Sequence, residues 1–226
     1  MKRSNRRSIG ISIDKKGNIS VAAPFKVSEG TIKELLLKKS SWILSKLAEL
    51  EKTATEANLP KTFRTGDKLL FMGQEHTLRL IEDKHLKRPV IRLGGSSHIE
   101  LYSSNTSEVE SLKAAIRNWY VDEFEKIIKQ SVGVHSRLLG VVPGRITIRE
   151  QRTRWGSCSS KGNLNFNWRL IMAPIDIINY VVIHELCHIK EMNHSANFWL
   201  LVGKLCPDFK LKRNWLKENG QRLTLD

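Results

Sequence analysis

The segment HELCHIKEMNH, which runs from His184 to His194, holds three of the chain's seven histidines. On a helix, His184 and His188 would point only about 40° apart with about 6 Å of rise, so both imidazoles could reach one ion. Glu185 would lie about 100° round the helix, beside the ion rather than bound to it. This spacing predicts a metal site in which the ion lowers the pKa of water and Glu185 accepts the water's proton.

A third ligand has to come from beyond the helix. On an unbroken helix, His194 would lie about 9 Å further along than His188 and about 240° round. We therefore expect the chain to turn after Glu191 or Met192, with Asn193 in the left-handed conformation that ends helices. With that break, His194 completes a three-histidine site and leaves a fourth position for water.

Other interpretations of these residues stay open. His184 and His188 could be core histidines or a surface pair. They could also hold a structural zinc ion, although Glu185 would then be idle and such sites usually have four protein ligands. Cys187 points away from both histidines and is expected to be a small core residue. Glu191 occupies the position at which H-E-x-x-H-x-x-G-x-x-H proteases have glycine, and no methionine follows for a Met-turn, so that clan is not expected.

Composition limits the class of protein. The chain has 226 residues and 40% hydrophobic residues, which is typical of a soluble globular protein. No apolar run approaches the roughly 20 residues that span a bilayer, and none follows the basic N-terminus, so we expect neither a membrane segment nor a signal peptide. The cysteines, Cys158, Cys187 and Cys206, show no disulfide pattern and indicate a reducing cytoplasm.

The net charge of +15 is concentrated toward the N-terminus, where residues 1–50 hold 11 Lys or Arg against 4 Asp or Glu. Charge of this sign attracts nucleotides and nucleic acid. The alternative is a solvated surface that keeps the protein soluble, and no named nucleic-acid motif focuses the charge.

Hydrophobic periodicity predicts an α+β fold in two regions. Residues 1–105 form an N-terminal β-rich region: a hairpin around the turn DKKGN, a helix capped by Ser28 that runs to about residue 54, and short strands. Residues 106–226 form the catalytic domain, with a long helix or a broken pair first. The other elements expected there are strands at 145–150 and 164–170, helices from Pro174 and after Ser195, and a last helix over 209–219.

Residues 164–170 alternate strictly between apolar and polar side chains. Leu164, Phe166, Trp168 and Leu170 face one way, and Asn165, Asn167 and Arg169 face the other. This pattern predicts a strand with one buried face and one open polar face.

The stretches RTRWGSCSSKGNLNFNWRLIMAP and YVVIHELCHIKEMNHSANFW resemble the YgjP-like family of metal-dependent hydrolases, relatives of the SprT-like and WLM-type zincin metallopeptidases. The N-terminal RSIGISIDKKGNISVAAP and SSWILSKL resemble it too, and the likeness is most specific over residues 151–199. The resemblance implies a zincin-like catalytic domain and Glu185 as the catalytic base. It also implies one zinc ion per chain, held by His184, His188 and His194.

The resemblance gives the alternating strand a role as well. In zincins, a strand upstream of the metal helix borders the cleft and can pair with an extended peptide. Asn165 and Asn167 are then candidate substrate-binding residues, with an ordinary solvent-facing edge as the alternative. Arg154 could stabilise a developing oxyanion or bind phosphate, or it could form a surface ion pair. Trp155 is expected to pack rather than to contact substrate.

Three classes of function remain at this point. The first is a zinc peptidase acting on peptides or proteins. The second is a metal-dependent, pyrophosphatase-like hydrolase of nucleotides or phosphate esters. It is favoured by the charge and by cations near the motif: Arg152, Arg154, Lys161, Arg169 and Lys190. The third is a binding module without activity, in which Glu185 is dispensable. We rank the peptidase first, because the strand upstream of the metal helix can pair with an extended peptide.

Overall fold

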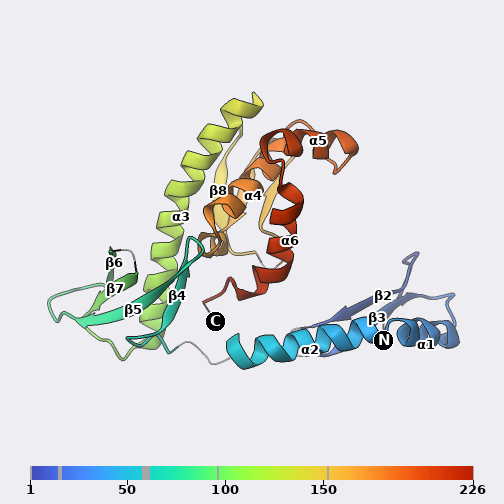
Figure 1. The fold of residues 1–226 in the computed structure, drawn as a ribbon, viewed down its shortest axis with the longest axis horizontal. Helices are drawn as coiled ribbons and strands as arrows, with labels where there is room; N and C mark the ends of the chain where they lie inside the picture. Colours follow the sequence, from blue (N-terminus) through green and yellow to red (C-terminus); the bar gives the residue numbers. More distant parts are fainter. Residues whose placement is uncertain (1, 15–16, 58–61, 96, 152, 226) are drawn as a thin grey trace. The chain divides into compact units, whose positions relative to one another are not determined.

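The computed structural model describes residues 2–14, 17–57, 62–95, 97–151 and 153–225, and the side chains of 49–57 are excepted. The chain separates into two compact units, Met1–Pro60 and Lys61–Asp226. Each unit combines helices with a small sheet or sheets, so the predicted α+β class is confirmed (Figure 1). Within the described residues, no helix has both the length and the apolar character needed to cross a membrane.

The first unit contains a sheet with the strand order β1-β3-β2. β1 (Lys2–Ser4) lies parallel to β3 (Ile19–Pro24), and β2 (Gly10–Ile13) lies antiparallel to it. β2 and β3 are the predicted hairpin, which is confirmed. The guanidinium of Arg3 donates to the backbone carbonyls of Pro24 and Val27. Part of the basic N-terminus is therefore built into the sheet.

The single helix predicted from Ser28 is in fact two helices, α1 (Glu29–Lys38) and α2 (Ser40–Ala57). The cap is confirmed, because the Ser28 Oγ accepts the N–H of Thr31 at 3.1 Å. α1 ends where the N–H of Lys39 is shared between the carbonyls three and four residues before it. Two serines follow, and serine side chains compete with the helix for backbone hydrogen bonds. The prediction of one helix was wrong because the apolar spacing continues through this break.

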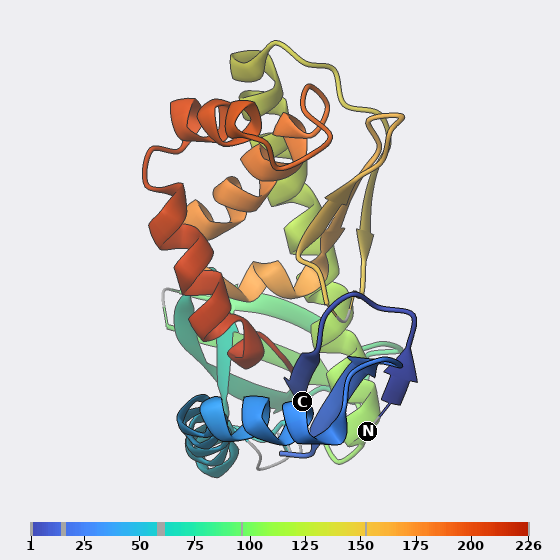
Figure 2. The same cartoon turned by 90° about the vertical axis from the view of Figure 1, so that its right-hand side faces the viewer.

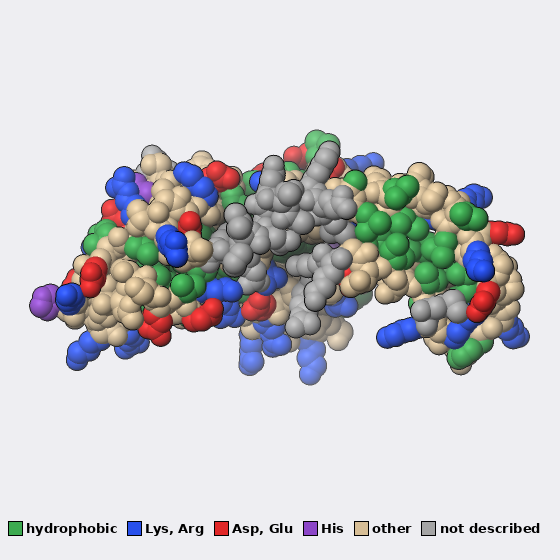
Figure 3. Space-filling view, turned by 90° about the horizontal axis from the view of Figure 1, so that it is seen from below, with side chains coloured by type: hydrophobic (Ala, Val, Ile, Leu, Met, Phe, Trp, Pro, Cys, Tyr) green, Lys and Arg blue, Asp and Glu red, His purple; other side chains and the backbone are tan. Residues whose placement is uncertain are grey.

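The first unit buries few apolar side chains. Among the side chains of this unit that the structure describes, the buried hydrophobic ones are Ala23, Ile32 and Ile43. Large apolar side chains are exposed on its helices, and Figure 3 shows green side chains gathered over this unit. The core formed by the described side chains of this unit is therefore small, as expected for a segment of this length.

The second unit begins with a four-stranded sheet in the order β4-β5-β7-β6. β5 and β7 are parallel, and the other neighbours are antiparallel. The strands are β4 (Lys68–Phe71), β5 (Gln74–Glu82), β6 (Val90–Gly94) and β7 (His98–Ser103).

The expected domain boundary at 105–106 falls inside this second unit. There α3 (Val109–Leu139) is one unbroken helix, which ends where Gly140 adopts a left-handed φ of 66°. The Tyr120 hydroxyl on α3 donates to the carbonyl of Leu70 at 2.6 Å. The N–H of Met72 donates to a carbonyl of the C-terminal half, that of Ile171, at 2.8 Å. Strands β4–β7 and the C-terminal half thus share one compact unit.

A second sheet has the order β8-β10-β9, with β10 in the centre. Its strands are β8 (Ile146–Arg149), β9 (Gly156–Cys158) and β10 (Leu164–Asn167). β10 is parallel to β8 and antiparallel to β9. The strand predicted over 164–170 is therefore shorter than expected, and it is not an edge.

The reason for this early end is Asn167. Its Oδ1 accepts the N–H of Arg169 at 3.2 Å, which caps a 3-10 helix, η1 (Trp168–Met172). The predicted buried face is confirmed even so, because its apolar members lie in the core: Leu164, Phe166, Trp168 and Leu170. The polar face is not open, since Asn167 is only 3% exposed.

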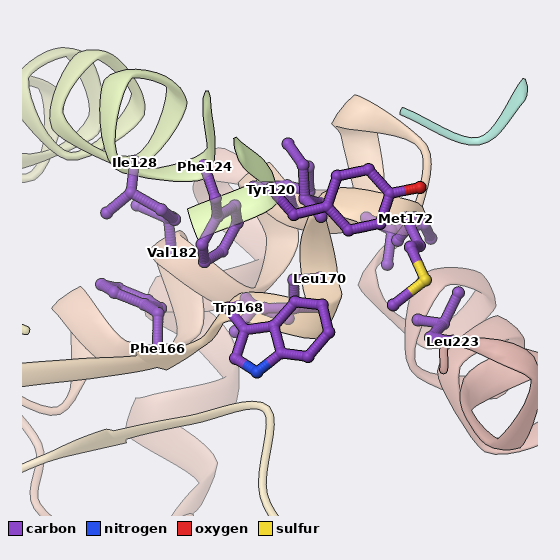
Figure 4. Close-up of a cluster of buried hydrophobic side chains, with 14 of the residues drawn as sticks. Tyr120, Phe124, Ile128, Phe166, Trp168, Leu170, Met172, Val182 and Leu223 are labelled. Carbon is purple, nitrogen blue, oxygen red and sulfur yellow. The ribbon is translucent and has the colours of Figure 1, made fainter. Parts of the chain in front are cut away.

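The core of the second unit lies between α3, β10, η1 and α4 (Ile175–Cys187). Figure 4 shows Tyr120 and Phe124 of α3 directed toward Phe166 and Trp168. α4 packs against α3, and Figure 2 shows the β8–β10 sheet on one side of it and the last helices on the other. The last elements are α5 (Ala196–Leu205), α6 (Phe209–Asn219) and the 3-10 helix η2 (Gly220–Arg222).

Candidate metal centre

α4 holds the first histidine and the glutamate in its last turn. Pro174 precedes the helix, and Asp176 lies in its first turn, at the positive end of the helix dipole. The residues between these ends are mostly buried, so the helix is fixed by the core. His184 and Glu185 therefore extend from a rigid element.

The chain turns earlier than the sequence predicts. α4 ends at Cys187 in tight turns, rather than beside Asn193. Among the described residues other than glycine, φ is positive at Phe63 and Met72 alone, so Asn193 is not left-handed and that prediction was wrong. The Oδ1 of Asn193 accepts the N–H of Ser195 at 3.1 Å, and Ser195 caps α5. Side-chain hydrogen bonding, not a left-handed residue, shapes this turn.

The three histidines come together around one point. One ligand atom from each of His184, His188 and His194 lies within 4.8 Å of the others. The Nε2 atoms of His184 and His194 are 3.0 Å apart. His188 is buried and His194 is exposed, so the cluster lies at the border between core and solvent. The predicted turn back of His194 toward the helix is confirmed by this geometry.

Hydrogen bonding and burial leave these imidazoles suited to a cation. The Nδ1 of His188 is 3.0 Å from the carbonyl of Glu191, which favours a proton on Nδ1 and a lone pair on Nε2. The Nδ1 of His184 is buried and has no hydrogen-bond partner among the described residues. Burial, followed by the charges of His188, His194 and Arg213, lowers the pKa of His184 to about 3. Burial also lowers the pKa of His194.

Neutral imidazoles that converge on one point are the donor set that zinc and related transition metals prefer. Carboxylate donors, which calcium and magnesium require, are missing from the described cluster of three histidines. The three side chains therefore fit a transition-metal ion by donor type and by spacing.

Glu185 lies next to the cluster and faces the second sheet. It is 5% exposed, and burial raises the pKa of its carboxyl to about 8, with the charge of Arg154 acting in the opposite direction. A side-chain carbon built on Gly156 of β9 would lie 2.7 Å from the Oε1 of Glu185. The backbone of β9 thus lies directly against this carboxyl.

A cavity of about 610 Å³ joins these groups. Its walls come from β9 with the two residues before it, from α4 with the turn that follows, and from α6. The lining residues include His184, Glu185, His188 and His194, together with all of β9.

The structure brings only one of the three predicted substrate residues into this cavity. Arg154 lines it, whereas Asn165 and Asn167 are absent from its described walls. The Nδ2 of Asn165 donates to the Oγ of Ser157 at 3.3 Å. The Nδ2 of Asn167 donates to the carbonyls of Gln151 and Arg154, at 2.8 and 3.2 Å. Both asparagines hold the strands around the cavity.

The cations proposed from sequence are also dispersed. Arg169 pairs with Glu150 at 2.9 Å, and Lys161 and Lys190 lie outside the described cavity walls. Arg152 lies outside the described residues.

Sequence reasoning missed several residues of the cavity, among them the polar side chains of Tyr180, Arg213 and Lys217. Tyr180 could have been found, because it lies four residues before His184 and so shares its helix face. Arg213 and Lys217 lie on α6, and nothing in the sequence around the histidines indicates that this helix returns to the site. Trp155, expected to pack rather than to contact substrate, packs so closely against Gly220 that a side-chain carbon there would lie 2.8 Å from its ring, and it also lines the cavity.

The model of the YgjP-like metallopeptidase domain matches residues 7–219. The chain belongs to the YgjP-like family. Membership confirms the resemblance and makes the protein a metal-dependent hydrolase of the peptidase type. The crystal structure of the metallopeptidase zymogen abylysin of Pyrococcus abyssi is similar over 40% of this chain and 93% of its own, with 24% identity and a TM-score of 0.37. A comparison with curated proteins gave no match.

Proposed function

We propose that this YgjP-like protein is a zinc-dependent peptidase in which Glu185 is the general base. The observation that supports it most is the placement of three converging histidines and one buried carboxyl in the same cavity. A structural zinc site would not need that carboxyl. It would also usually have a fourth protein ligand, and none joins the described cluster.

His184, His188 and His194 would hold the ion, one per chain. When bound, zinc supplies a Lewis acid that lowers the pKa of water and polarises a carbonyl group. The hydrogen bond between the His188 Nδ1 and the carbonyl of Glu191 orients that ring and keeps its Nε2 available.

Glu185 would accept the proton of the attacking water and return it to the leaving amine. Burial raises the pKa of this carboxyl to about 8, and a dication on the neighbouring histidines would favour the ionised form by charge attraction. Its position one residue after His184 would place it beside a bound ion rather than among the ion's ligands.

β9 is the strand that supports a peptide as substrate. It lies at the end of its sheet and pairs with β10 on one side, and all three of its residues line the cavity. An extended peptide could add to such an edge through backbone hydrogen bonds. From the sequence, this role was assigned to residues 164–170. We now assign it to Gly156–Cys158, the strand that pairs with Leu164–Phe166.

The second candidate is hydrolysis of nucleotides or phosphate esters at the same site. Its supporting observation is the presence of Arg154, Arg213 and Lys217 on the cavity wall. Phosphate groups are usually held by several donors that converge in a glycine-rich loop. These cations instead come from two separate elements, so we place the peptidase first. Nucleic acid as a partner is supported by the net charge alone.

Replacing Glu185 by Gln tests the proposal, because glutamine keeps the shape but cannot accept a proton. We expect unchanged zinc content and fold, with a loss of turnover on the order of 100-fold or more, as for a lost general base. Zinc content, melting temperature and turnover should be measured on the same preparation. Turnover within a few-fold of wild type would remove Glu185 from the role of base.

A further inference from the structure

The cavity carries an excess of positive charge on its walls. Arg154, Arg213 and Lys217 line it, and Glu185 is the one carboxyl among its described lining residues. Within the described part of the chain, none of these three cations forms an ion pair. Three cations that form no ion pair, beside a reaction site, attract an anionic part of the substrate.

Arg213 is held at a defined place next to the histidines. Its guanidinium carbon lies 5.3 Å from the centre of the Trp199 ring, at cation–π distance. Trp199 in turn stacks on His194, with centroids 5.6 Å apart and planes 22° apart. Phe209 stacks on Trp199 as well, at 5.1 Å and 16°. A continuous stack thus connects Arg213 to His194 and limits where the guanidinium can lie.

Arg154 comes from a different part of the chain, the segment before β9. It lies two residues before β9, and its carbonyl accepts a hydrogen bond from the buried Nδ2 of Asn167 at 3.2 Å. Its backbone is therefore fixed while its side chain is exposed to the cavity. Lys217 lies four residues after Arg213, on the same face of α6.

We propose that Arg213, together with Arg154 and Lys217, forms a subsite for a carboxylate of the peptide substrate. That carboxylate belongs to an aspartate or glutamate side chain or to a free C-terminus near the scissile bond. The inference rests on the proposed peptidase function and adds a substrate class to it. A guanidinium matches the planar carboxylate with two parallel hydrogen bonds, which gives direction as well as attraction.

Direct binding tests the subsite without turnover. The zinc-loaded Glu185→Gln protein should be titrated with peptide pairs that differ by Glu against Gln at one position, or by a free against an amidated C-terminus. We expect the acidic member of one pair to bind about five- to tenfold more tightly, as for a partly exposed charged hydrogen bond. Which pair shows the difference identifies the source of the carboxylate.

The variant Arg213→Gln, added to that protein, should abolish this preference, and Arg213→Lys should keep part of it. Lys210→Gln is the matched control, because Lys210 is an exposed cation of the same helix outside the described cavity walls. It changes the net charge equally and should leave the preference intact.

The outcomes separate this inference from the proposed function. Cleavage of peptides without any acidic preference would overturn the subsite and keep the peptidase. Acidic peptides that bind through Arg213 but are never cleaved would keep the subsite and overturn the peptidase. An equal loss in Lys210→Gln would show general charge attraction only. Tighter binding of inorganic pyrophosphate than of any acidic peptide, lost in Arg213→Gln, would replace the carboxylate by a phosphate.

Discussion

Gly156 lies so close to Glu185 that a side-chain carbon at this glycine would be 2.7 Å from the carboxyl Oε1. Glycine is needed here for space rather than for backbone freedom, since its φ is not positive. The close approach lets β9 hold the carboxyl on the cavity side of α4. The predicted general base is thus positioned by the strand that we assign to the peptide.

Gly156→Ala should displace the carboxyl of Glu185 and reduce turnover by at least about tenfold, since small misplacements of catalytic groups cost this much. The added methyl should also lower the free energy of unfolding by about 1–3 kcal/mol, as overpacking does. Zinc content should not change. Gly133→Ala is the control, because a side-chain carbon there meets nothing within 4 Å. Normal turnover in Gly156→Ala would contradict the positioning role of β9.

The zinc site should respond to each histidine. We expect His184→Ala and His188→Ala to lose the ion, because both rings come from the end of α4 and form the larger part of the site. His194→Ala should weaken binding by about 100-fold or more, since three protein ligands leave little redundancy. Metal analysis of the purified variants after dialysis measures this.

His85→Ala provides the comparison, as His85 is an exposed histidine outside the cluster. It should retain one zinc ion per chain. Full zinc occupancy in His194→Ala would exclude His194 as a ligand and direct attention to Glu191, whose carbonyl already contacts His188.

The stability of the metal-free protein should depend on pH through Glu185. Burial raises the pKa of this carboxyl from 4.5 to about 8, so between these values the folded protein retains a proton that the unfolded chain has lost. The free energy of unfolding therefore falls as pH rises through this range. Glu185→Gln removes that contribution. The melting temperature of this variant should therefore rise relative to that of wild type as the pH increases from about 5 to about 9.

The same melting curves with saturating zinc serve as the comparison. A bound dication stabilises the ionised carboxylate, so the pH-dependent gap between the two proteins should shrink. A gap that stays constant with pH in the metal-free proteins would show that Glu185 is not held in a desolvated state.

The two asparagines of β10 should behave differently. Asn167→Ala removes side-chain hydrogen bonds to Gln151, Arg154 and Arg169 from a buried position, so we expect a loss of about 2–3 kcal/mol in stability. Asn165→Ala removes one contact, to Ser157, and should cost less than about 1 kcal/mol. Chemical denaturation of both variants measures the difference. Equal costs would indicate that Asn167 has no special role as a cap.

The sequence is informative where chemistry and periodicity coincide in one segment. His184 and Glu185 lie in the last turn of α4, and His188 follows it directly in a helical conformation, so their spacing alone predicts their arrangement. The buried face of 164–170 was also predictable, because alternation reports burial directly. The polar face was wrongly predicted to be open, because Asn167 hydrogen-bonds to the backbone of a distant loop. The alternation of polar and apolar residues does not distinguish such a buried asparagine from an exposed one.

Other parts of the site depend on tertiary contacts. Arg213 reaches the cavity because α6 packs back against α4, and Trp199 holds its guanidinium. β9 has only three residues, Gly156–Cys158, which is too short for a strand pattern. The sequence also predicted the end of α4 too far along the chain. The residues whose carbonyls close its last turns are not of the types that usually end a helix.

We propose above all that the site hydrolyses peptide bonds with Glu185 as base. The most direct test is mass spectrometry of an unfolded protein and a peptide library after incubation with the zinc-loaded protein, with phosphate release from nucleoside triphosphates followed in parallel. We predict new peptide termini with wild type, none with Glu185→Gln at equal zinc content, and no Glu185-dependent phosphate release. Phosphate or pyrophosphate release that requires Glu185, without any peptide cleavage that requires it, would contradict peptide hydrolysis as the function of this site.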